Sequence, residues 1–134
     1  MRKNPLNNLA SLSMLALLLL SSLLQPTTAQ AQTDPISGAV AYLQANQQAD
    51  GGITGFSGTS DADTTARAVL GLAASGQAVD ALRSADGLSL LDYLQAQSII
   101  YTHDETGLLY PGRAGLLLAA VAVAGGTPQQ FGGM

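Results

Sequence analysis

The sequence predicts an all-α fold made of two antiparallel α-hairpin repeats, at about 35–84 and 86–130. Apolar residues recur with the spacing of helices rather than strands in four segments, and glycines follow the second and fourth segments. The four residues Tyr42-Leu43-Gln44-Ala45 return unchanged as Tyr93-Leu94-Gln95-Ala96. The period of about 46 to 51 residues is typical of an array of helix pairs.

Residues 1–31 are expected to be a secretory signal peptide that is removed from the mature protein. Two basic residues precede an apolar run from Leu9 to Leu24, and the A-x-A pattern of a cleavage site ends at Ala31. The run is shorter than the ~20 residues that span a bilayer, which favours cleavage over a retained anchor. We therefore expect a secreted, periplasmic or cell-surface protein that meets the membrane only through this segment.

The remaining segment, 32–134, is acidic and lacks both lysine and cysteine. Three arginines stand against nine Asp and Glu residues. A segment with this net negative charge is not expected to have a basic surface that binds nucleic acid or anionic lipid. Without disulfides the domain must be held together by packing. No motif for a cofactor is present, so none is predicted.

The first hairpin is expected to join a helix at about 35–47 to a helix at about 63–75. Asp34-Pro35 has the form of an N-cap followed by proline at the first helical position. Asp50-Gly51-Gly52 predicts a turn rather than a calcium loop, because the acidic spacing of such a loop does not follow it. Phe56 is the one large apolar residue of the connector and is expected to anchor it.

The second hairpin follows a linker or short turn of helix at 78–84. Asp86-Gly87 marks the expected start of its first helix, whose apolar face includes Leu88 and three further leucines. A connector is expected from Ser98 to Gly107, and the last helix at about 112–124 ends at a pair of glycines.

Two sets of residues could be taken for ligand sites, but both favour a structural role. Tyr42 and Tyr93 occupy matching positions and are expected to pack between hairpins. His103-Asp104-Glu105 offers one histidine and two adjacent carboxylates in a connector. These lack the converging ligands of a metal site, so an exposed connector is favoured.

The pattern Gly38-x3-Tyr42-Leu43-x3-Gln47-x3-Gly51-x-Ile53 resembles the Gln-Trp repeat motif of the terpenoid cyclase and protein prenyltransferase α/α toroids. That superfamily includes squalene-hopene cyclases, prenyltransferase β subunits and cobalamin carriers of the intrinsic factor type. Ile53 stands where the motif has tryptophan, and Ser98 stands at the glutamine position of the second copy. The resemblance implies a ring of inner and outer helices. Because such arrays need at least ~3 repeats, we expect a partial, incomplete α/α toroid.

The segment Asp61-Ala62-Asp63-Thr64-Thr65-Ala66 is similar to the D-x-D-D-T-A motif that carries the proton donor of class II cyclases. The resemblance implies that Asp63 would be the catalytic acid and Asp61 its partner, with Thr64 in place of the last aspartate. A general acid needs a raised pKa, and the lost carboxylate removes a like charge that would raise it. A helix N-terminus favours the ionised form, so a capping role is favoured over catalysis.

The residues favour a non-catalytic function. A prenyltransferase zinc site needs a cysteine, which the chain lacks, and a cyclase cavity needs more aromatic side chains than this chain has. We expect an exported helical-repeat module that binds further repeats of the same protein, a second copy of itself, or a hydrophobic or small-molecule ligand. A class II terpene cyclase-like enzyme with Asp63 as its acid is one alternative. Binding of a cobalamin-type ligand is another.

Overall fold

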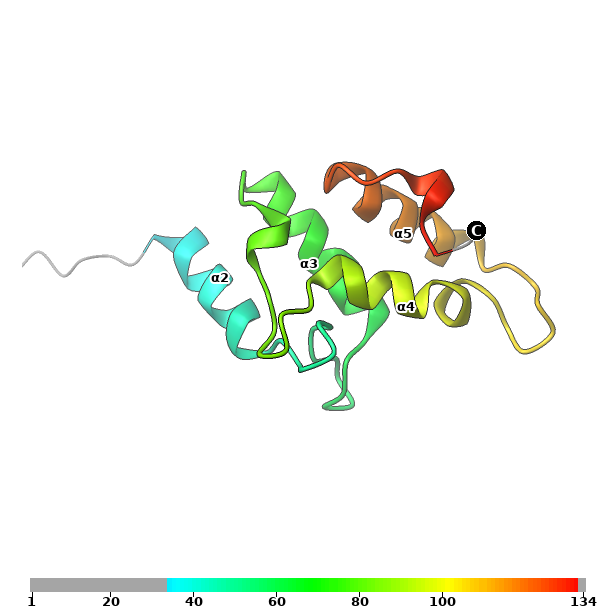
Figure 1. Ribbon diagram of the computed structural model, residues 1–134, viewed down its shortest axis with the longest axis horizontal. Helices are drawn as coiled ribbons and strands as arrows, with labels where there is room; N and C mark the ends of the chain where they lie inside the picture. The colour runs from blue at the N-terminus through cyan, green and yellow to red at the C-terminus, as the bar shows by residue number, and fades with distance from the viewer. Residues whose placement is uncertain (1–33, 133–134) are drawn as a thin grey trace, which may run out of the picture. The chain divides into compact units, whose positions relative to one another are not determined.

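The computed structural model describes residues 34–132, so the predicted signal peptide, 1–31, lies outside the described residues. Within this range the chain forms four α-helices and no named strand, which confirms the all-α prediction (Figure 1). The helices are α2 (Pro35–Ala45), α3 (Ala62–Ala74), α4 (Leu90–Thr102) and α5 (Pro111–Val123), with the short 3-10 turns η2 (Val79–Ala81) and η3 (Pro128–Gln130). In the part of the chain that the structure describes, no helix has the length and apolarity needed to cross a membrane.

The core lies where α3, α4 and α5 meet, since each of these helices packs against the other two. Burying a large aliphatic side chain contributes roughly 1.5–3 kcal/mol. The connector between α2 and α3 also reaches this core through Ile53, whose N–H donates to the Thr65 hydroxyl over 2.9 Å. The largest fully buried aliphatic side chains are Ile53, Val69, Leu90, Leu94, Leu117 and Val121.

Helix α2 packs far less closely than the other three. None of its residues is buried, and only Val40 and Leu43 are partly buried against the core. In Figure 1 it stands beside α3 at one end of the helical unit. Two hydrogen bonds tie this part of the chain to residues 83–84: Gln44 of α2 donates to the carbonyl of Arg83 over 2.9 Å, and Ser84 donates to the carbonyl of Ala49, just after α2, over 2.9 Å.

Four five-residue turns share one backbone design. In each, the first N–H donates to the fifth carbonyl, the fourth residue is a glycine with positive φ, and the flanking residues form an isolated antiparallel bridge. The first of these turns contains Asp50-Gly51-Gly52, which confirms the turn predicted there. The four turns span residues 48–52, 55–59, 84–88 and 104–108.

Helix boundaries follow the expected caps, except at α4. Asp34 caps α2, and α5 begins at its proline and ends before Gly125, close to the predicted limits. The predicted start of the third helix at Asp86-Gly87 was wrong. A capping box starts α4 after Ser89 instead: the Ser89 hydroxyl accepts from the Asp92 N–H over 3.1 Å, and the Asp92 carboxylate accepts from the Ser89 N–H over 2.8 Å.

The connector predicted from Ser98 was also too long. Helix α4 continues to Thr102, which is fully buried and donates its hydroxyl to the Ser98 carbonyl over 2.7 Å. The buried Ser98 hydroxyl lies 3.3 Å from the Gly132 carbonyl, so this helical end is tied to the segment that follows α5. Only the next residue, His103, turns to extended backbone.

Two packing predictions fail at single residues. Phe56 does not anchor its connector, because it lies at the tip of the 55–59 turn and is fully exposed. Tyr93 packs in the core as expected, but the matching Tyr42 is 67% exposed. The ring of Tyr93 is covered by the connector before α3, where it lies against Gly52. Among the described residues nothing covers Tyr42 in the same way.

Candidate functional site at the start of α3

Asp61 is the N-cap of α3. Its backbone is extended, and one carboxylate oxygen accepts from the Thr64 N–H over 2.7 Å and from the Thr64 hydroxyl over 2.6 Å. The Asp61 carbonyl also accepts from the Thr65 hydroxyl over 2.6 Å. Thr64, which stands where the cyclase motif has its last aspartate, therefore serves the cap of the helix.

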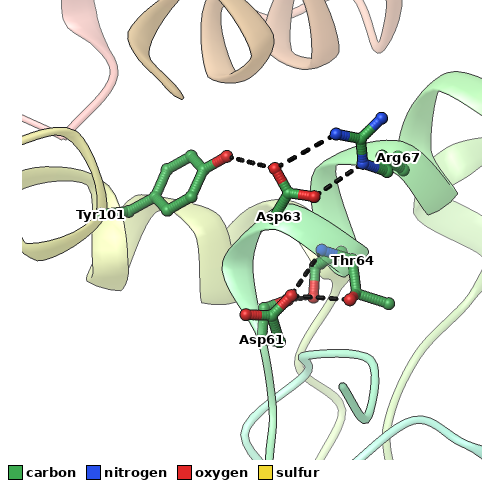
Figure 2. Close-up of polar contacts among 6 residues, drawn as sticks. Asp61, Asp63, Thr64, Arg67 and Tyr101 are labelled. Atoms are coloured by element: carbon green, nitrogen blue, oxygen red, sulfur yellow. Dashed lines mark hydrogen bonds and ion pairs between the residues drawn. The ribbon is translucent and has the colours of Figure 1, made fainter. Parts of the chain in front are cut away.

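Asp63 lies one residue inside α3 and faces two donors (Figure 2). The Arg67 Nε donates to one carboxylate oxygen over 2.6 Å, and the Tyr101 hydroxyl, from α4, donates to the other over 3.0 Å. The side chains of Asp63 and Arg67 are 44% and 68% exposed, so water reaches this ion pair. The carboxylate thus joins the first turn of α3 to the last turn of α4.

These contacts keep Asp63 ionised. The hydrogen bond from Arg67 is the largest cause that lowers its pKa, and it outweighs the smaller effect of desolvation, which acts to raise it. The hydrogen bond from Tyr101 lowers the pKa further. On Tyr101 the effects are opposite in sign: burial first, and then the bond to Asp63, raise the pKa of the phenol to about 12. The pair is therefore a carboxylate and a neutral phenol over the physiological pH range.

Arg113 lies over the ring of Tyr101. Its guanidinium carbon lies 5.6 Å from the centroid of the Tyr101 ring and 4.6 Å from that of Tyr110, within the range of cation–π contacts. Arg113 and Tyr101, together with Asp61 and Asp63, line an open pocket of about 380 Å³ between the start of α3 and the end of α4. The pocket holds one guanidinium and two carboxylates at its wall, which is a polar rather than an apolar lining.

The two aspartates of the candidate catalytic pair do not act on each other. Asp61 binds Thr64, whereas Asp63 binds Arg67 and Tyr101, so they belong to separate hydrogen-bond groups (Figure 2). The expectation that Asp63 caps the helix is corrected: Asp61 is the cap, because only its side chain accepts a backbone N–H of the first turn.

The His103-Asp104-Glu105 segment forms one of the four glycine turns. One Asp104 carboxylate oxygen accepts from the N–H groups of Thr106 and Leu108, over 2.8 and 2.9 Å. The hydrogen bond from the Thr106 hydroxyl is the first cause that lowers the pKa of Asp104. Among residues 34–132 no three His, Asp or Glu side chains gather as metal ligands would.

Sequence reasoning did not identify Arg67 and Tyr101 as partners of Asp63. Arg67 could have been found, because residues four apart lie on one face of a helix and an acid before a base is the favourable order. Tyr101 could not have been found in this way, since it contacts Asp63 across 38 residues of sequence. Comparisons of the chain with protein-family models, with curated proteins and with solved structures found no match.

Proposed function

We propose that the chain is an exported, non-catalytic helical-repeat module that acts by binding, related in its architecture to part of an α/α toroid. The observation that carries the non-catalytic half is the set of contacts on Asp63. A proton donor at this position would need a raised pKa, but the Arg67 guanidinium and the Tyr101 hydroxyl lower it. These contacts count against the class II cyclase alternative.

The matching positions of the two hairpins support the repeat. Gly76 and Gly125 follow the second helix of each hairpin with φ of 71° and 78°. One turn before these glycines stand Leu72 and Val121, and both are buried. In the first helices, Leu43 and Leu94 both turn toward the core, although only Leu94 is fully buried. The apolar N-terminal run supports export.

A turnover assay tests the non-catalytic claim. The purified chain is incubated with squalene or another polyprenyl substrate, and cyclised or hydrated products are measured by gas chromatography. We expect no product above the protein-free control. Product formation that is lost in Asp63→Asn but kept in Asp61→Asn would contradict the proposal, because asparagine at the cap preserves the helix start.

A further inference from the structure

The two hairpins differ in what covers them, and the difference identifies a vacant surface. The second hairpin is covered by the first: α3 packs against both α4 and α5, and the connector before α3 lies on Tyr93. The corresponding surface of the first hairpin is a groove of about 340 Å³ between α2 and α3. Six residues that line it, none of them charged, are Ile36, Val40, Leu43, Ala68, Gly71 and Leu72. We call this surface the head groove.

Within residues 34–132, α5 also has one side that no other helix covers. After Arg113 this helix contains no polar residue, so it is apolar all round, the pattern of a helix that is buried on every side. Its buried row packs on α3 and α4, but the opposite row is open to solvent. We call this opposite row the tail face; it consists of Gly115, Leu118, Ala119 and Ala122.

Some of the large exposed apolar residues occur near these two surfaces. Ile36 and Tyr42 are exposed on α2, beside the head groove. Leu108, Leu109 and the half-exposed Tyr110 lie in the connector that leads into α5. This connector precedes α5 in the second hairpin. The connector that covers Tyr93 precedes α3 in the first hairpin in the same way. In Figure 1, α2 and the connector before α5 stand at opposite ends of the helical unit.

We infer that two copies of this chain associate head to tail, with α5 of one copy in the head groove of the next. The inference rests on the proposed helical repeat and names its partner as a second copy. Within one chain, α3 of the first hairpin already packs against both helices of the second hairpin. The same contact between two copies places the tail face of one copy on Ala68 and Gly71 of the next. The connector before α5 of the first copy then lies over Tyr42 of the next. One contact thereby covers both surfaces.

A head-to-tail contact is heterologous, because the two copies contribute different surfaces. Each dimer then keeps one free head groove and one free tail face. We therefore expect association to continue beyond the dimer, either to a closed ring or to an open chain of copies. Neither surface carries a charged residue, so association is expected to be insensitive to salt.

Sedimentation velocity tests the inference. The sample is the full chain, purified in the form in which the expressing cell produces it. The wild-type chain should associate as its concentration rises. Gly71→Glu, in the head groove, and Leu118→Glu, on the tail face, should each weaken association by about a hundredfold or more, because the contact would bury an unpaired carboxylate. An added Cβ at Gly71 meets nothing within 4 Å, so the monomer accommodates the change. Ala39→Glu, on the other wall of the groove, is the second variant should Gly71→Glu lose its helical circular dichroism.

A mixture of the two variants shows whether association uses the head groove and the tail face rather than some other pair of surfaces. The Gly71→Glu chain keeps its tail face and the Leu118→Glu chain keeps its groove, so an equimolar mixture should form a one-to-one complex that neither variant forms alone. Phe56→Glu is the matched control: it places the same charge on an exposed apolar residue outside both surfaces, and it should associate like the wild type.

Three results would overturn the inference: a monomeric wild-type chain at all concentrations, loss of association in Phe56→Glu, or no complex in the mixture. A monomer is also the result expected if residues 1–31 or a different protein fills the groove. The outcome is independent of the turnover assay, because Asp63 belongs to neither surface. A catalytic chain could still associate, and a monomeric chain could still lack turnover.

Discussion

At the scale of single residues, the pKa shifts of Asp63 and Tyr101 have different main causes: the hydrogen bond from Arg67 for the carboxyl, and burial for the phenol. The hydrogen bond that the Tyr101 hydroxyl donates to Asp63 over 3.0 Å adds to both shifts, lowering the pKa of the acid and raising that of the phenol. The two shifts have opposite consequences for stability. Asp63 stabilises the fold above the pKa that it has in the unfolded chain, and this contribution is lost as the pH falls through its lower folded pKa. Because Asp63 is nearly half exposed, its effect is small.

Tyr101 provides the first prediction. Its folded pKa is raised to about 12, so the folded chain holds this proton where the unfolded chain has released it. Stability from Tyr101 should be fully present below about pH 10, the ordinary phenol pKa, and should be lost as the pH rises toward 12. An ultraviolet titration of tyrosinate absorbance should show a late step near pH 12 that Tyr101→Phe removes and Tyr42→Phe preserves. If all tyrosines ionise together near pH 10 in the folded chain, Tyr101 has neither the burial nor the hydrogen bond described for it.

At the scale of the elements, two helices that share a four-residue sequence differ in how deeply that sequence is buried. Leu43 on α2 and Leu94 on α4 occupy the same place in an identical four-residue segment. Leu94 is only 1% exposed, whereas Leu43 is partly buried. Identical local sequence therefore leads to different energetics, because the neighbouring helices differ.

This pair supplies the second prediction. Leu94→Ala should reduce the free energy of unfolding by about 2–5 kcal/mol, since it removes a fully buried side chain and leaves a cavity. Leu43→Ala should cost about 1 kcal/mol, because solvent already reaches that position. Urea unfolding followed by circular dichroism measures both values under conditions in which the chain is monomeric. Equal losses would mean that α2 is packed as tightly as α4.

The glycine turns supply the third prediction. Gly51 has φ of 89°, and a Cβ added there would lie 2.5 Å from the Ser89 carbonyl oxygen. Gly107 has φ of 81° in the equivalent turn, but an added Cβ would meet nothing within 4 Å. Gly107→Ala should therefore cost about 1 kcal/mol for backbone strain alone. Gly51→Ala should reduce the free energy of unfolding clearly more in the same urea experiment. Equal losses would show that the backbone at Ser89 shifts to make room for the added Cβ.

The helix ends show how far sequence reasoning reaches at this scale. The limits of α2, α3 and α5 were predicted to within a few residues, because proline, aspartate and glycine signal helix ends through local backbone chemistry. The start of α4 was missed because Asp86-Gly87 signals a turn just before it, while the true cap is Ser89 with Asp92. Its extension to Thr102 depends on burial by distant segments, which local sequence does not encode.

At the scale of the whole molecule, α3, α4 and α5 share one core, whereas α2 has no buried residue. Sequence periodicity predicted the helices and their all-α class, but it could not show which of two matching tyrosines would be covered. Tyr93 is buried because the connector before α3 lies on it, and Tyr42 is exposed for want of such a segment. The contact of Asp63 with Tyr101 was unpredictable for the same reason, since Tyr101 reaches it from another helix.

The uncovered surfaces lead to the fourth prediction. If copies of the chain cover one another, folding and association are linked, and the melting temperature should rise with protein concentration. Differential scanning calorimetry at several concentrations should show this rise for the wild type and a smaller rise, or none, for Leu118→Glu. A melting temperature that stays constant with concentration in the wild type would mean that the single chain is the stable unit.

The central claim is that the acidic turn at the start of α3 is structural and that the chain acts without acid catalysis. The most direct test is the pKa of the Asp63 carboxyl, measured by carbon-13 NMR titration of the folded chain with Asp63→Asn to assign the signal. We predict a pKa below the ordinary aspartate value, because Arg67 and Tyr101 both stabilise the carboxylate. A pKa of about 6 or higher, the range of a working general acid, would contradict the claim.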